Sequence, residues 1–243
     1  MEGHKLIHTP VADVIDLESG GRDVPYATPV HEGTVVQRSE FVRTVYRILT
    51  VQLLVTAAIV SPFVLSTSVR ATVDRNPWMV GVALVVGFGT MLSLVCFRPR
   101  NVGVAWTMLG IHTVAEGIVM GVVSAHYTTE SVFVAILMTA VVTTTLTVYA
   151  WRTKTDLRGM GAYLFVAFVS FLLFWIVSML FQSRIVQWLY CAFGVLLFSV
   201  YLIYDTQWIV SGGQYALGDE ALGALSLYQD ILRLFVFLLR LLR

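Results

Sequence analysis

Charged residues are scarce in this 243-residue sequence, and their scarcity excludes several classes of protein. Charged residues make up 13% of the chain, whereas a soluble domain has roughly 25%. The formal net charge is +1, so the clustered basic surface that binds nucleic acid is missing, and we expect no nucleic-acid partner. The two cysteines, Cys96 and Cys191, both fall within apolar stretches. A disulfide framework is therefore excluded as well.

Sequence signatures of catalysis are also missing. There is no Gly-rich phosphate loop, no cluster of His and Cys residues for a metal, and no Gly-x-Ser-x-Gly elbow. The nearest enzyme class is an intramembrane aspartyl protease, because Tyr204-Asp205 matches the first half of its active site. The second half requires Gly-x-Gly-Asp, whereas Asp230 follows Leu-Tyr-Gln at 227–229. We therefore expect no enzyme and no bound cofactor, and the protease is the least supported alternative.

Long apolar stretches are what the sequence has in abundance, since 57% of its residues are hydrophobic. After Glu40 they recur with lengths of about 20 residues, enough to cross a hydrocarbon core of roughly 30 Å. We predict an all-α membrane protein, a bundle of seven transmembrane helices near 46–67, 78–97, 103–124, 131–151, 161–182, 186–210 and 222–242. The last stretch contains Gln229, Asp230 and Arg233, so it could be a helix at the bundle centre or a re-entrant segment.

Residues 1–37 have a different composition from the rest of the chain. They contain no long apolar run, and they are rich in residues that interrupt regular structure, namely Pro10, Gly20, Gly21, Pro25, Pro29 and Gly33. They also contain six acidic residues, Glu2, Asp13, Asp16, Glu18, Asp23 and Glu32. Such a segment cannot bury a core. We predict a disordered acidic tail over 1–37 and a membrane domain over 38–243.

Arginine and lysine residues near the ends of the predicted spans indicate the orientation. Eight of them would share the side of the tail, and three would lie on the other side, or five with Arg240 and Arg243 if the last stretch is a full span. The larger group is Arg38, Arg43, Arg47, Arg98, Arg100, Arg152, Lys154 and Arg158, and the smaller is Arg70, Arg75 and Arg184. Because cytosolic loops are enriched in Lys and Arg, the N-terminus is predicted to be cytosolic.

Two aspartates, Asp205 and Asp230, interrupt the sixth and seventh predicted spans. A carboxylate in the bilayer is costly and usually faces the bundle interior, a cavity or an ion path. If the two side chains meet in a low-dielectric setting, they compete to ionise and would share a proton near neutral pH or below. Such a pair can respond to pH and can bind a hard cation such as calcium through its oxygens. The alternative is that Asp230 only pairs with Arg233 on the same helix.

Three further polar residues could act with this pair. Glu116 interrupts the third span with His112 one turn earlier on the same face, so the two could form part of a proton or cation route. Alternatively, Glu116 is a neutral buried acid bonded to a neighbouring hydroxyl. Tyr204 lies on the same helical face of its span as Tyr201 and Trp208, next to Asp205, and is a candidate modulator of that carboxyl group.

Arg98 lies where the second span ends. It could reach inward and hold the aspartates through a charge-assisted hydrogen bond, which would close the path. The alternative is an arginine that extends to the membrane interface, as many arginines near helix ends do.

The chain resembles the transmembrane Bax-inhibitor-motif family, in particular its lifeguard and Golgi anti-apoptotic branches. The resemblance lies in three segments, SEFVRTVYRILTVQLLVT (39–56), FSVYLIYDTQWIV (198–210) and GALSLYQDILRLFVFLLRLL (223–242). The sequence Ala-Glu-Gly at 115–117 is similar to the acid-bearing third span of that branch.

The resemblance implies a fold in which a central helix is wrapped by the others. It also implies that Asp205 and Asp230 are the family's paired aspartates and that Arg98 bonds to them in the closed state. Glu116 matches an acid often found in the third span. The chain departs from the family at Arg233, where an asparagine is typical. A fixed positive charge there could stabilise both carboxylates, weaken a response to pH and repel calcium.

On this basis we predict a pH-sensitive, calcium-permeable leak channel that lowers stored calcium and suppresses apoptosis. Its location would be the endoplasmic reticulum, the Golgi or another internal membrane. Asp205 and Asp230 would be the calcium ligands, and calcium would be the transported ion rather than a cofactor. Expected partners are membrane lipid and either cell-death regulators or calcium-release channels. The alternative is a non-conducting membrane scaffold that inhibits cell death through protein partners.

Overall fold

Helices account for nearly all of the part of the chain that the structure describes, and seven of them are long and apolar enough to cross a membrane. The computed structural model describes residues 29–242 except 100, 182 and 214. The long helices are α1 (Val35–Leu65), α3 (Trp78–Phe97), α4 (Val102–Ala125), α5 (Thr129–Arg152), α6 (Gly161–Leu180), α7 (Arg184–Ser211) and α8 (Glu220–Leu241). The shorter elements are α2 (Thr67–Arg75) and the 3₁₀ turns η2 (Val30–Glu32) and η3 (Arg158–Met160). The prediction of an all-α bundle with seven spans is confirmed.

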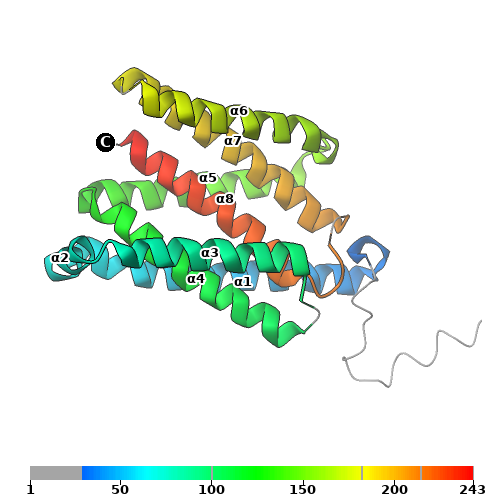
Figure 1. The fold of residues 1–243 in the computed structure, drawn as a ribbon. Helices are drawn as coiled ribbons and strands as arrows, with labels where there is room; N and C mark the ends of the chain where they lie inside the picture. Colours follow the sequence, from blue (N-terminus) through cyan, green and yellow to red (C-terminus); the bar gives the residue numbers. More distant parts are fainter. Residues whose placement is uncertain (1–28, 100, 182, 214, 243) are drawn as a thin grey trace, which may run out of the picture.

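The long helices alternate in direction, so the bundle has two ends (Figure 1). One end, which we call the tail-side end, holds the start of α1, the start of α8 and the end of α7. The opposite end holds α2 and the C-terminus of α8. Because α8 runs as one continuous helix from one end toward the other, the last apolar stretch is a spanning helix and not a re-entrant segment.

Helix α8 lies at the centre of the bundle. Of its most apolar window, 78% is buried, against 17% for the corresponding windows of α3 and α5. It packs against α1, α4, α5 and α7, which surround it in Figure 1. The prediction of a central helix wrapped by the others is therefore confirmed, and any polar side chain on α8 must find its partner inside the protein.

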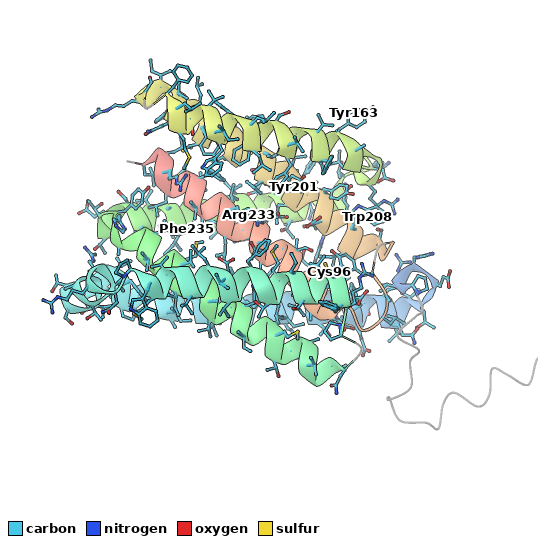
Figure 2. All side chains as sticks on the ribbon, in the orientation of Figure 1. Cys96, Tyr163, Tyr201, Trp208, Arg233 and Phe235 are labelled. Atoms are coloured by element: carbon cyan, nitrogen blue, oxygen red, sulfur yellow. The ribbon has the colours of Figure 1, made fainter. Side chains whose placement is uncertain are left out.

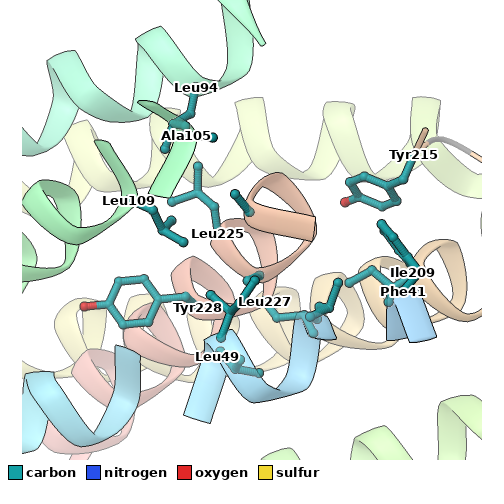
Figure 3. Packing of buried hydrophobic residues seen from close by; sticks show 14 of the residues in the cluster. Phe41, Leu49, Leu94, Ala105, Leu109, Ile209, Tyr215, Leu225, Leu227 and Tyr228 are labelled. Atoms are coloured by element: carbon teal, nitrogen blue, oxygen red, sulfur yellow. The ribbon is translucent and has the colours of Figure 1, made fainter. Parts of the chain in front are cut away.

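Large apolar side chains of α8 fill the tail-side half of the bundle (Figure 3). Leu227 and Tyr228 are almost fully buried there between α1, α4 and α7. The Tyr228 hydroxyl lies 2.7 Å from Thr56 Oγ1 of α1, so the one polar atom of this ring has a partner. The packing fixes the rotation of α8 and with it the direction in which its acidic side chain points.

Helix α1 begins at Val35, earlier than the residue near 46 predicted for the first span. Thr34 and Gln37 form a reciprocal capping box, which supplies partners for backbone N–H groups at the start of the helix. The extra turns lie at the tail-side end, where the sequence is too polar to register as a membrane span.

The predicted tail is described only from residue 29 onward, and residues 1–28 lie outside the described part. Between 29 and 37 the chain forms η2 and the start of α1. The Val30 side chain is 1% exposed, and its N–H donates to the Tyr215 carbonyl at 2.9 Å. The last residues of the predicted tail are therefore docked on the loop between α7 and α8.

Candidate functional site

The structure brings Asp205 and Asp230 together at the contact between α7 and α8. Their carboxyl groups lie close to each other inside the bundle. The Asp230 side chain belongs to the buried core at 5% exposure, whereas Asp205 is half-buried. Asp230 Oδ2 is buried and has no hydrogen-bond partner among the described residues. Two ionised carboxylates only accept hydrogen bonds, so a proton on one of them is needed to join the pair.

Arg233 lies one turn beyond Asp230 on α8 and does not form an ion pair with it. Its guanidinium carbon is 5.5 Å from the centre of the Phe198 ring of α7, an arrangement that favours the cation electrostatically. The ion pairs found between described residues do not include Arg233. Figure 2 labels Arg233 and Tyr201, which come from the neighbouring helices α8 and α7. The site is thus a carboxyl pair with a cation nearby, not an Asp–Arg ion pair.

His112 and Glu116 meet on α4, as their spacing predicts, but their shared partner is Gln229 of α8. Gln229 Nε2 lies 2.7 Å from His112 Nε2 and 3.2 Å from Glu116 Oε1. The other ring nitrogen of His112 lies 3.0 Å from the Gly87 carbonyl of α3. One polar cluster therefore links α3, α4 and α8.

The hydrogen-bond pattern assigns a proton arrangement to this cluster. An amide nitrogen can only donate, so His112 Nε2 must accept from Gln229, and the imidazole is neutral. Its Nδ1–H then donates to the Gly87 carbonyl. The second N–H of Gln229 is left for Glu116. His112 is fully buried, and its two nitrogens are satisfied.

Arg98 does not contact the aspartate pair. Its Nη1 lies 3.6 Å from Asp219 Oδ2, in the loop before α8, and 56% of its side chain is exposed. Helix α3 ends at Phe97, and Arg98 adopts a left-handed backbone conformation with φ 37°. That conformation ends the helix before the guanidinium can enter the bundle. In this structure Arg98 links the end of α3 to the start of α8. The clamp on the aspartates in a closed state stays a prediction.

Tyr204 faces helix α6 rather than the carboxyl pair. A Cβ atom at Gly161 would lie 2.9 Å from the Tyr204 hydroxyl, so the absence of a side chain there makes room for the phenol. The ring packs edge to face on Trp208, with 6.1 Å between ring centres. The proposed role of Tyr204 as a modulator of Asp205 has no contact to support it.

Tyr215 is a site residue that the sequence did not indicate. It lies in the loop between α7 and α8, is 6% exposed, and packs its ring on Phe41 of α1 with 6.0 Å between centres. Its hydroxyl lies 3.2 Å from Ser226 Oγ. Burial raises the pKa of Tyr215, and the negative charge of Asp205 raises it further. A neutral phenol therefore lies near Asp205 in the loop before α8. The only sequence signal for this residue is its place in a Gly-rich loop.

The described residues contain no group of three His, Cys, Asp or Glu side chains placed to hold a metal ion. Calcium usually takes six to eight oxygen ligands. Two carboxyl groups are thus too few for a tight resident site, although they can hold an ion that keeps much of its water. Two carboxyl ligands therefore suit a cation that binds weakly in passing better than a tightly bound resident ion.

Comparisons with known proteins match the whole membrane domain. A family model described as an inhibitor of apoptosis-promoting Bax1 matches residues 38–243. Human protein lifeguard 3 is 33% identical over 212 residues, which cover 84% of this chain and 68% of the relative. The mouse protein of the same name is 32% identical over 212 residues. The Golgi anti-apoptotic protein of Vaccinia virus (strain Lister) is 28% identical over 220 residues, which cover 90% of this chain and 92% of the relative.

Proposed function

This chain belongs to the Bax inhibitor family, and we propose that it is a pH-sensitive, calcium-permeable leak channel that suppresses apoptosis. Suppression of apoptosis is supported by the description of the family and by the name of its viral relative. The channel would lower the calcium content of an internal store and so weaken signals that lead to cell death.

The observation that best supports the calcium proposal is the proximity of the Asp205 and Asp230 carboxyl groups at the contact between α7 and α8. Asp230 keeps an unpartnered buried oxygen among the described residues. A buried carboxyl oxygen without a donor costs free energy, and a structural role would have supplied that donor. A cation or a proton can satisfy this oxygen in turn, and such an exchange is what an ion path gated by pH requires.

The test is calcium flux into liposomes that contain the purified protein. Wild-type protein should admit calcium, and the flux should change with pH because the pair shares a proton. Asp205→Asn and Asp230→Asn should each reduce the flux and flatten its pH profile, since an amide carries no titrating proton. Asp156→Asn, in an exposed loop, is the matched control and should behave as wild type. Properly folded wild-type protein without flux would overturn the proposal.

A membrane scaffold without conduction is the second candidate, and the docked segment around Val30 favours it. Val30 of this segment binds the α7–α8 loop, and a cytosolic regulator of cell death or a calcium-release channel could bind at this surface. Deletion of residues 1–28 leaves η2 and α1 intact. If this deletion abolished cell protection while Asp205→Asn and Asp230→Asn preserved it, protection would depend on protein binding and not on conduction.

We place the protein in an internal membrane with its tail-side end in the cytosol. The excess of arginine and lysine at that end supports the orientation, and the viral relative is named for the Golgi. Members of the Bax inhibitor family are generally not enzymes, which agrees with the absence of Gly-x-Gly-Asp before Asp230. Fluorescence microscopy of a tagged protein, with protease protection of each terminus, tests location and orientation together.

A further inference from the structure

A lateral groove with a volume of about 480 Å³ opens on the outside of the bundle between α1 and α5. Its floor is the central helix α8, through Ile231, Leu232 and Phe235. The volume lies within the range of roughly 300–1,000 Å³ that is usual for sites that hold small molecules. The groove reaches the one helix that carries Asp230, because Ile231 is the next residue in the chain.

The walls of the groove are suited to an apolar occupant. Most of the lining side chains are aliphatic or aromatic, including Val60, Val132 and Phe133. The hydroxyls of Ser61 and Thr139 lie in the wall, but they donate to carbonyls of their own helices. Thr143 Oγ1 is the one lining hydroxyl that is buried without a hydrogen-bond partner among the described residues. A single such hydroxyl is too little polar lining for a sugar, a nucleotide or an ion.

The groove begins at the opposite end of the bundle and runs to about its middle. Along α1 its lining extends from Leu65 to Leu53, and along α5 from Thr129 to Thr144. At 1.5 Å per residue these lengths are roughly 18–22 Å. One leaflet of the hydrocarbon core is about 15 Å thick, so the groove matches the depth reached by an acyl chain from one leaflet.

A positive charge stands at the outer end of the groove. Arg70 of α2 donates from its side chain to the carbonyls of Phe63 and Val64, and Val64 lines the groove. A guanidinium has five N–H donors, so Arg70 keeps donors for an anion after both bonds are made. Guanidinium groups bind phosphate through paired hydrogen bonds, as they do carboxylate.

We propose that this groove binds one phospholipid of the leaflet opposite the tail, with an acyl chain along α8 and the phosphate at Arg70. An acyl chain leaves an apolar environment when it enters, so transfer from water supplies no driving force. Retention instead rests on the fit of the chain between α1 and α5 and on the pairing of phosphate with arginine. The lipid would thus support the central helix beside the carboxyl pair from the membrane side.

Native mass spectrometry of detergent-purified protein, after exchange into mixed detergent and phosphatidylcholine, tests this proposal. Wild-type protein should retain one phospholipid per chain after the excess is removed. Ala57→Phe fills the groove, because Ala57 lines it, and should lower the retained fraction by about tenfold, equivalent to about 1.4 kcal/mol. Ala58→Phe is the matched control, since Ala58 is also exposed on α1 but does not line the groove. It should retain lipid as the wild type does.

Arg70→Gln tests the contribution of the lipid headgroup apart from that of the acyl chain. It should weaken retention of the phospholipid, whereas the circular dichroism spectrum and the elution volume of the protein should stay unchanged. Equal retention by the wild type and Ala57→Phe would overturn the proposal. The same holds if Ala57→Phe lowers the oligomer mass without changing bound lipid, because the groove would then hold a second copy of this chain. The readout needs no ion flux, so it stands apart from the test of the channel.

Discussion

Two acid-bearing regions of this bundle share the central helix and differ in how their polar atoms are satisfied. In the cluster of His112, Glu116 and Gln229, each polar contact has a donor and an acceptor. In the pair of Asp205 and Asp230, both groups are acceptors, and one buried oxygen has no partner among the described residues. Residues 229 and 230 are neighbours in the chain, yet they face α4 and α7 respectively.

This difference indicates that the cluster of His112, Glu116 and Gln229 stabilises the bundle, whereas the pair of Asp205 and Asp230 can exchange a proton or a cation. A buried network with all its partners holds helices in one arrangement, and this one joins α3, α4 and α8. A pair of like groups is held together only while a proton or a cation lies between them. The resemblance to known families assigned importance to Glu116 and to the aspartates alike, and the hydrogen bonds separate their roles.

The largest effect on stability is expected from Gln229→Leu. Loss of the amide leaves His112 Nε2, which is buried, and Glu116, which is partly buried, without their donor, and this costs about 1–3 kcal/mol. The midpoint of thermal unfolding in detergent should fall by several degrees. Gln187→Leu is the matched control, because Gln187 is exposed at the start of α7. A small loss for Gln229→Leu would mean that the cluster is not structural.

Asp230→Asn should lower calcium flux without lowering stability, in contrast to Gln229→Leu. The new amide can donate to Asp205, so stability should be unchanged or higher by up to about 1 kcal/mol, although calcium flux falls. The same thermal measurement decides, at a pH where Asp205 is ionised. A loss of stability comparable to that of Gln229→Leu would show that the Asp230 carboxylate has a cationic partner, and Arg233 would be the candidate.

A smaller effect is expected at the link between Arg98 and Asp219. The pair is part-exposed, with an N–O distance of 3.6 Å, so its coupling should be about 0–1 kcal/mol. A double-mutant cycle of Arg98→Gln and Asp219→Asn measures it, with Arg152→Gln as a control on an exposed arginine. If Arg98→Gln changed calcium flux as strongly as Asp230→Asn, Arg98 would reach the pair in a conducting state.

The smallest effect is expected at Asp156. Hydrogen bonds from Arg158 lower the pKa of Asp156 from 3.8 to about 2. A lowered folded-state pKa means that this contribution to stability is complete above about 3.8 and is lost as the pH falls toward 2. Asp156 therefore stays ionised around neutral pH. Asp156→Asn should leave the pH profile of calcium flux unchanged, and a shifted profile would assign the pH response to this loop rather than to the buried pair.

Much of the architecture could be predicted from apolar length alone. The predicted spans agree with α3 to α8 to within a few residues, because a membrane-crossing helix must be apolar for about 20 residues. The predicted start of the first span lies after the actual start of α1, because the first turns of this helix are polar. The only sequence signal for its true start is the helix cap formed by Thr34. The docking of Val30 was not foreseen, because a single valine in a polar segment carries no periodic signal.

Apolar lengths along the chain were enough to predict a membrane protein, the positions of its helices and the few polar residues within them. Helical spacing also placed His112 and Glu116 on one face. Which of these residues meet depends on how the helices pack. In the folded protein Asp205 lies beside Asp230, Glu116 accepts a hydrogen bond from Gln229, and Arg98 lies 3.6 Å from Asp219. Spacing along a helix sets the face on which a side chain lies, but its partner depends on how helices far apart in the chain rotate and pack.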